Sequence, residues 1–251
     1  TGVQTCALPI WSGIGWVLLL AVTPLAWFIV RNPARPQPAP PGEHTDPETS
    51  FTLTEALATP AFWLFAISSS LFGLAYSGIA LFNQSILEQR GFDASVYHQV
   101  LVVSTLIGLL ANFSGGWLAT RWPLQRLIGL GMALLALALA ALPEVATHSA
   151  VMLYGVAMGI SGGVITVVFF SVWGQTFGRA HLGKIQGVAQ MMTVVASALG
   201  PLLLAETLER TGSYDSIFRL LALLVALCGL ASWLVPFPTH AVREVDLRCD
   251  A

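Results

Sequence analysis

Long apolar runs alternate with short polar segments along almost the whole chain. Seven runs are mostly apolar, and they cover residues 11–30, 60–82, 99–119, 127–142, 150–173, 185–208 and 217–235. A helix needs roughly 20 apolar residues to cross about 30 Å of hydrocarbon, and only the fourth run is short enough to need flanking residues. None shows the strict alternation that a strand of a membrane barrel requires. The pattern therefore predicts seven transmembrane helices.

Composition agrees with a membrane protein. Hydrophobic residues make up 55% of the chain and charged residues 10%, and the mean hydropathy is +0.75. A soluble domain carries about 25% charged residues. The net charge of -2 comes with no basic stripe, which argues against a nucleic-acid partner. We therefore expect an integral membrane protein that is embedded in the lipid bilayer.

A proline-rich segment separates the first run from the second. It reads RNPARPQPAPPGEHTDPETS over residues 31–50, and its prolines forbid a continuous helix, so we expect a linker. The next residues, FTLTEALATPAFW, predict a short interfacial helix with Thr52 or Thr54 as its cap. Pro60 is then expected to open the following span.

The basic residues predict the orientation. With the linker in the cytoplasm, eight of the 11 Lys and Arg residues fall inside: Arg31, Arg35, Arg121, Arg126, Arg179, Lys184, Arg243 and Arg248. Three fall outside: Arg90, Arg210 and Arg219. Because cytoplasmic loops of membrane proteins carry an excess of Lys and Arg, we expect the linker and the C-terminal tail to be cytoplasmic.

The first ten residues, TGVQTCALPI, do not resemble the start of a protein, since they contain no Met, Lys or Arg. The codons ACT GGA GTT CAG ACG TGT GCT CTT CCG ATC encode them, and that string resembles a short-read sequencing adapter. Our hypothesis is that an adapter was translated in frame onto a truncated gene, so that the protein proper begins near Trp11. The alternative is a native but unusual N-terminus.

One helix, a cytoplasmic linker and six helices form an uneven architecture. It is explained if residues 11–30 are the last helix of one six-helix half and residues 60–236 are the second half. Residues 31–59 would then be the linker with its interfacial helix, and residues 237–251 a cytoplasmic tail. On this interpretation the missing partner is the N-terminal half of the same chain.

Three segments then resemble the major facilitator superfamily. GGWLATRWPLQR, residues 115–126, is similar to the family's cytoplasmic motif at Gly116, Leu118, Arg121 and Arg126. Thr120 stands where the family has an acidic residue and Pro123 where a Gly is usual, which puts in doubt any gating pair that needs the acid. FGRAHLGKIQGVAQ, residues 177–190, and ALGPLLLAETLERTGSYDSIF, residues 198–218, are the other two segments.

The resemblance implies an all-α, polytopic helical bundle that contains the family's helices six to twelve. It implies a multi-pass protein of the cell's inner (plasma) membrane that carries a small solute by secondary active transport. In such proteins the substrate binds near the midplane and the two halves rock around it. Within the family, the sequence most resembles carriers of small organic anions or monocarboxylates.

Polar residues within the apolar runs are candidates for the substrate pathway. Gln186, Gln190, Thr193 and Ser197 recur at i, i+4, i+7 and i+11 and therefore share one helix face. Such a stripe either lines a polar path or joins helices, at roughly 0.6 kcal/mol per bond. Tyr76 and Asn83 share a face of residues 60–82 and the turn after it, and we favour a cavity for both. Asn112 is a third candidate, with packing as its favoured role.

Further residues are candidates for bending, gating and coupling. Gly200 and Pro201 should kink their helix, because proline lacks the N–H that the ladder needs. Gly116, Arg121 and Arg126 are candidates for the gating loop. No Asp, Glu, Lys or Arg lies in the middle of a span, so the best coupling candidate is Glu206 near an outer end.

The sequence predicts no enzyme, cofactor or metal site. It contains no phosphate-binding loop and no pairing of a nucleophile with a base, and its five His and three Cys residues are scattered. Two alternatives to a carrier remain open at this stage. One is a complete seven-helix receptor or sensor, and the other is a protein with the transporter fold that does not transport.

Overall fold

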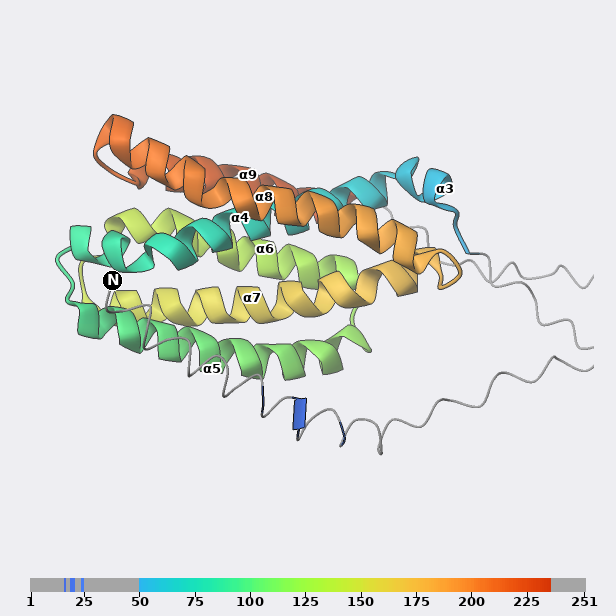
Figure 1. The fold of residues 1–251 in the computed structure, drawn as a ribbon, viewed down its shortest axis with the longest axis horizontal. Coiled ribbons are helices and arrows are strands. Elements are labelled where there is room, and N and C mark those ends of the chain that lie inside the picture. The colour runs from blue at the N-terminus through green and yellow to red at the C-terminus, as the bar shows by residue number, and fades with distance from the viewer. Residues whose placement is uncertain (1–15, 17–18, 21–23, 25–49, 236–251) are drawn as a thin grey trace, which may run out of the picture. The chain divides into compact units, whose positions relative to one another are not determined.

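The computed structural model describes residues 16, 19–20, 24 and 50–235, and the account below concerns residues 50–235. This part is helical, and no strand occurs in it. The elements are α3 (Leu53–Leu57), α4 (Pro60–Gln89), α5 (Ala94–Ala119), α6 (Leu124–Ala141), the 3-10 turn η2 (Leu142–Glu144), α7 (His148–Phe177), α8 (Leu182–Thr211) and α9 (Asp215–Leu234) (Figure 1). The predicted all-α polytopic fold is confirmed. The predicted helix at 11–30, the adapter-like segment and the tail lie outside the described residues or are placed only at single positions.

Six helices are long and apolar enough to cross a membrane. Most extend beyond the predicted apolar runs, and α4, for example, has 30 residues. At 1.5 Å per residue this is about 45 Å, which matches a bilayer with its headgroup regions rather than the hydrocarbon alone. The difference arises because apolar content marks hydrocarbon depth, whereas the helical hydrogen-bond ladder continues into the polar end turns.

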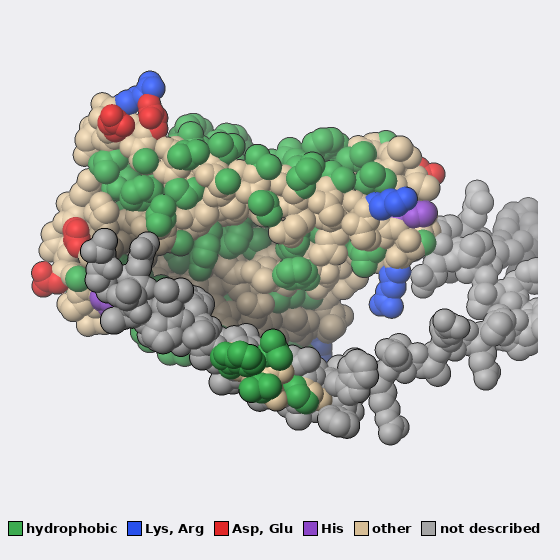
Figure 2. Space-filling model, in the orientation of Figure 1, with side chains coloured by type: hydrophobic (Ala, Val, Ile, Leu, Met, Phe, Trp, Pro, Cys, Tyr) green, Lys and Arg blue, Asp and Glu red, His purple; other side chains and the backbone are tan. Residues whose placement is uncertain are grey.

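The six helices run alternately up and down, so their ends gather at two ends of the bundle. We call the end that holds α3, the start of α4 and the loop between α5 and α6 the linker end, and the opposite one the loop end. Figure 2 shows charged side chains at these two ends and apolar side chains between them. This distribution is what a span through lipid requires, since a charge at mid-bilayer is costly.

The linker end begins with a capped helix. Thr52 donates its backbone N–H to Glu55 Oε2 at 2.8 Å and accepts the Glu55 N–H on its hydroxyl, so Thr52 rather than Thr54 caps α3. The bond from the Thr52 backbone, and then that from its hydroxyl, holds the pKa of Glu55 below its ordinary range. This reciprocal cap therefore stabilises α3 at neutral pH and weakens as the pH falls through that lowered pKa. Thr59 caps α4 one residue before Pro60.

Two helix pairs pack most closely, and α5 with α7 is the first. The pair meets along small residues: a Cβ on Gly159 would lie 2.6 Å from the Ser104 carbonyl, and one on Gly163 would lie 2.6 Å from Ala111 Cβ. Lipid tails are as apolar as leucine, so helices in membranes associate through such close backbone contact rather than through a hydrophobic driving force. The glycine face of α7 therefore allows α5 to pack closely against it.

The second close pair is α4 with α8, and it is built around Pro201. Proline has no N–H, so the carbonyl of Ser197 four residues earlier loses its helical partner. The hydroxyl of Ser77 on α4 donates to that carbonyl at 2.7 Å. Next to it, Gly200 leaves no room for a Cβ, which would collide with the Leu74 carbonyl of α4. The proline break and the interhelical contact thus form one unit.

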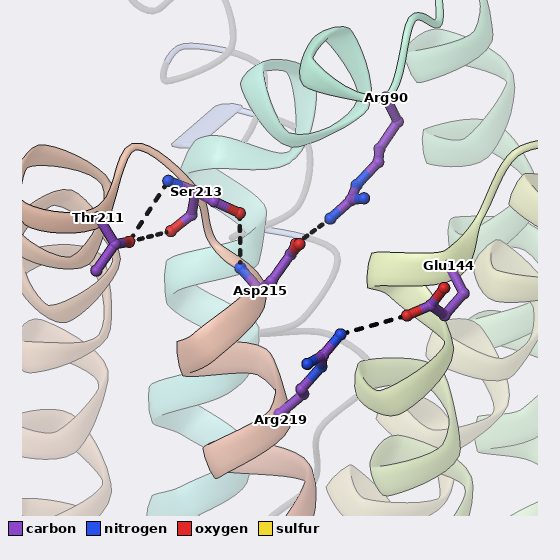
Figure 3. A network of polar contacts seen from close by, with 6 residues as sticks. All are labelled: Arg90, Glu144, Thr211, Ser213, Asp215 and Arg219. Atoms are coloured by element: carbon purple, nitrogen blue, oxygen red, sulfur yellow. Dashed lines mark hydrogen bonds and ion pairs between the residues drawn. The ribbon is translucent and has the colours of Figure 1, made fainter.

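Packing against α6 and ion pairs at the loop end connect the remaining helices. Helix α6 packs against both α9 and α7, and Ser161 on α7 donates to the buried Gly131 carbonyl on α6 at 2.9 Å. At the loop end Arg90 pairs with Asp215, and Arg219 lies 3.4 Å from Glu144 (Figure 3). Exposed ion pairs contribute little stability, so these contacts mainly fix where α9 begins.

We expect Gly163→Ala to destabilise the bundle by about 1–3 kcal/mol, because the added Cβ meets backbone and a neighbouring Cβ that cannot move aside. The adjacent Gly162 is the matched control. A Cβ there would lie 3.7 Å from the Tyr76 ring, which is ordinary contact, so Gly162→Ala should be neutral or slightly stabilising. Thermal unfolding midpoints in detergent measure the difference, and equal midpoints for the two variants would contradict the close α5–α7 contact.

We expect Ser77→Ala to lower stability by about 1–3 kcal/mol, because the Ser197 carbonyl is left buried without a donor. The same substitution should cost much less in a Pro201→Ala background, where residue 201 regains its N–H. A double-mutant cycle on the thermal midpoint tests this coupling. Additive effects of the two substitutions would show that Ser77 does not serve the proline break.

Candidate functional site

A cavity of about 70 Å³, lined by both apolar and hydrogen-bonding side chains, opens between α4, α5 and α7. Ten residues line it: Tyr76, Ile79, Ala80, Asn83, Tyr97, Val100, Leu101, Ser104, Tyr154 and Met158. Those of α4 and of α5 follow the same spacing of i, i+3, i+4 and i+7, so each helix presents one face. Drug-sized ligands occupy pockets of about 300–1,000 Å³, so this cavity can hold one polar group rather than enclose a whole ligand.

The cavity lies between the two closely packed helix pairs. Helix α4 packs along α8, and α5 along α7, while α4 touches α5 and α7 only marginally. Tyr76 lies near the middle of α4, and Asn83 lies seven residues, or about 10 Å, nearer the loop end. The cavity therefore extends from the middle of the bundle toward the loop end.

Two buried polar atoms in the cavity have no hydrogen-bond partner among the described residues. They are Oδ1 of Asn83, whose residue is 9% exposed, and the hydroxyl of Tyr154, whose residue is 4% exposed. Leaving such an atom unpaired costs about 1–3 kcal/mol, so each one in a native fold calls for an explanation. Both atoms belong to residues that line the cavity, so a polar group that reached either one after a small side-chain movement would supply the missing bond.

Tyr76 stands at the inner edge of the cavity and is the most accessible of its aromatic residues. It is 44% exposed and stacks on Phe72 with ring centroids 5.2 Å apart. Gly162 of α7 faces both rings, and only a Cβ added there would come within van der Waals distance of them. The Tyr76 hydroxyl is thus carried on a ring that is supported by Phe72.

The lining combines apolar side chains with uncharged polar ones. Its hydrogen-bonding side chains are tyrosine, serine and asparagine, and the lining contains no Asp, Glu, Lys, Arg or His. The Ser104 hydroxyl already donates to the Leu101 carbonyl at 3.1 Å. Within the described part of the chain, the cavity therefore offers neutral donors and acceptors to a ligand.

Of the predicted pathway residues, the structure brings Tyr76 and Asn83 together in this cavity. It adds Tyr97, Ser104 and Tyr154, which the sequence reasoning missed. Tyr97 and Ser104 repeat the seven-residue spacing of Tyr76 and Asn83, a signal that was available in the sequence. Tyr154 and Ser161 repeat the same spacing, but Ser161 donates to the Gly131 carbonyl on α6 and does not line the cavity.

The polar stripe of α8 lies elsewhere. Thr193 and Ser197 pack against α4 at Gly73, where an added Cβ would lie 3.1 Å from Thr193 Cγ2 and 2.6 Å from Ser197 Oγ. The Thr193 hydroxyl donates to the Ala189 carbonyl of its own helix at 3.0 Å. Gln186 is half-buried and Gln190 exposed, and neither lines the cavity. Their part in a substrate path stays a prediction.

The other candidates are also spread over the bundle. Asn112 is half-buried on α5 beside Gly163, and Glu206 is exposed at the loop end, where it pairs with Arg210. Gly116 is half-buried with open space above its Cα. The Arg121 guanidinium lies 4.4 Å from the centroid of the Trp117 ring. Arg126 lines a separate cavity at the linker end.

The polar side chains of the cavity are hydrogen-bonding groups. Within residues 50–235, no group of three or more His, Cys, Asp or Glu residues lies close enough to hold a metal ion. The site has an uncharged cavity with several hydrogen-bonding side chains, and α8, which packs on α4, continues as a helix through Gly200 and Pro201.

Comparison with known proteins agrees with this picture. The sequence profile of the "Major Facilitator Superfamily" matches residues 65–247. Two relatives, both named "Monocarboxylate transporter 13", come from Rattus norvegicus and Bos taurus, and each is 26% identical to this chain over 168 residues. That alignment covers 66% of this chain and 39% of each relative, so the chain spans about two fifths of the relatives' length. The chain belongs to the major facilitator superfamily.

Proposed function

We propose that this chain is part of a secondary transporter that carries a small monocarboxylate or related organic anion by alternating access. The observation that carries the proposal is the pair of unpartnered atoms, Asn83 Oδ1 and the Tyr154 hydroxyl, in a cavity that reaches mid-bundle. A passing solute is the ligand that a membrane protein of this family would place there. The family match favours this reading over a seven-helix receptor.

The size of the cavity suggests that it binds only part of the substrate. A phenol and an amide can hydrogen-bond a carboxylate or a neighbouring hydroxyl, but they cannot neutralise a full negative charge. In our proposal a second six-helix half completes the site and supplies the balancing cation. The relatives' names support a monocarboxylate as the class of substrate.

The proposal assigns the bending step to α8. A helix with a proline break can change direction at low cost, provided that the freed carbonyl keeps a partner. Ser77 gives that partner from α4, the helix that also carries Tyr76 and Asn83. A bend at Gly200 and Pro201 would therefore be transmitted to the cavity lining through α4. In this proposal the exposed Glu206, already paired with Arg210, has no part in binding.

We expect Asn83→Ala to raise the KM for uptake by about tenfold, as loss of one hydrogen bond to a charged ligand would. The matched control is Gln84→Ala on the next residue, whose amide bonds Glu88 at 2.8 Å outside the cavity. Uptake of radiolabelled two- to five-carbon monocarboxylates into proteoliposomes measures this, with the full-length product of the gene. Equal effects of the two substitutions would argue against the cavity as a substrate site.

Tyr154→Phe gives a second, independent prediction. Its hydroxyl has no partner among the described residues, so removing it breaks no bond of the fold. We expect uptake to fall severalfold while the thermal midpoint stays unchanged or rises. A lowered midpoint with unchanged uptake would mean that the hydroxyl serves the structure. Substrate binding by calorimetry without any uptake would instead favour a transporter-fold protein that does not transport.

A further inference from the structure

A second cavity, separate from the first, lies at the linker end between α6 and α9. Its volume is about 520 Å³, and six residues line it: Trp122, Gln125, Arg126, Leu130, Ser232 and Trp233. The first four come from the start of α6 and the turn before it, and the last two from the final turn of α9. Nothing in the proposed transport step uses this cavity.

Close contact between α6 and α9 builds one wall. A Cβ on Gly129 would collide with the indole nitrogen of Trp233 and lie 2.7 Å from the Ser232 hydroxyl. The glycine therefore lets the indole lie flat on α6. The indole N–H of Trp233 makes no hydrogen bond to residues 50–235, and the ring remains 69% exposed. The Trp233 ring therefore borders the cavity with an N–H that has no partner among these residues.

The cavity is electropositive. Arg126 is exposed and forms no ion pair with any carboxylate in the described part of the chain. Helix α6 starts here after Pro123, which provides no side-chain cap, so the positive end of the helix dipole is also unopposed. An uncompensated guanidinium next to an uncapped helix start favours an anionic group, and phosphate above all.

The surroundings place this cavity at the depth of lipid headgroups. Four exposed tryptophans gather at the linker end: Trp63, Trp117, Trp122 and Trp233. Tryptophan is enriched where membrane meets water. Among residues 50–235 this end also carries four cations, Arg121, Arg126, Arg179 and Lys184, against the single acid Glu55. A soluble anion would not require the aromatic belt, whereas a lipid headgroup lies within it.

An apolar track leads from the cavity along the spans. On α6, Leu130 and Leu137 are exposed at 41% and 66% and continue the face of Arg126. On α9, Leu223, Leu227 and Leu230 are exposed, and Trp233 lies in the last turn of the same helix. Such a track is what the acyl chains beneath a bound headgroup need.

We propose that this cavity is a binding site for one anionic phospholipid. Arg126 and the first-turn N–H groups of α6 hold the phosphate, and the Trp233 indole N–H donates to a headgroup oxygen. The acyl chains lie along the exposed leucines of α6 and α9. Basic pockets between helices at a membrane surface are known to bind acidic headgroups, and the site proposed here has both the charge and the apolar track.

The test uses the purified 251-residue chain in detergent with added phosphatidylglycerol or phosphatidylcholine, followed by native mass spectrometry. We expect one phosphatidylglycerol to be retained in preference to phosphatidylcholine. Arg126→Gln should reduce this preference at least about fivefold, while Arg126→Lys should keep most of it. The matched control is Lys184→Gln, which removes an exposed cation at the same end but outside the cavity, and it should have little effect.

Three outcomes would overturn the proposal. The first is equal retention of the two lipids by the unaltered chain. The second is an equal loss in Arg126→Gln and Lys184→Gln, which would show diffuse attraction to a charged end. The third is a rise in the thermal midpoint with millimolar inorganic phosphate that matches the rise with phosphatidylglycerol and depends on Arg126, which would show a site for a soluble anion. Trp233→Phe gives a second variant that keeps the wall but removes the N–H, and it should weaken retention.

Discussion

The hydrogen bond from Ser77 to the Ser197 carbonyl is the contact on which the arrangement of this bundle most depends. In lipid no water replaces a lost backbone partner, so a proline within a spanning helix is tolerated only where a neighbour satisfies the freed carbonyl. Here the neighbour is α4, and Gly200 lets the two backbones meet at that level. The proline within the continuous helix α8 and the position of α4 therefore depend on each other.

The position of the cavity follows from this pairing. Helix α4 is held to α8, and the glycine face of α7 holds α5, so the two pairs meet along a line where packing is loose. Polar side chains from three helices face one another along that line. Two of their atoms have no partner among residues 50–235, which costs free energy that a ligand able to reach them would relieve. In a family whose members move solutes across membranes, a role in binding a solute would explain why these atoms are unpaired.

Sequence reasoning predicted the spans well because apolar length is a strong local signal in lipid. It predicted Tyr76 and Asn83 as cavity candidates from their shared face, and the structure places both in one cavity. It did not find Tyr154, because its place beside α4 depends on how α7 packs on α5 through glycine contacts far apart in sequence. Thr193 and Ser197 lie on one helix face as expected. Periodicity alone does not say whether such a face packs against a neighbouring helix or lines a substrate path.

The most direct test of the central claim, that the cavity belongs to a water-accessible path, is thiol labelling. Asn83→Cys and Leu137→Cys would be made with Cys6, Cys228 and Cys249 replaced by alanine, and a membrane-impermeant maleimide applied from each side in turn. The account predicts that Asn83→Cys reacts and that a transported monocarboxylate slows the reaction, while Leu137→Cys, on the exposed apolar face of α6, stays unlabelled. A folded Asn83→Cys protein that never reacts, or that reacts no faster than Leu137→Cys, would contradict it.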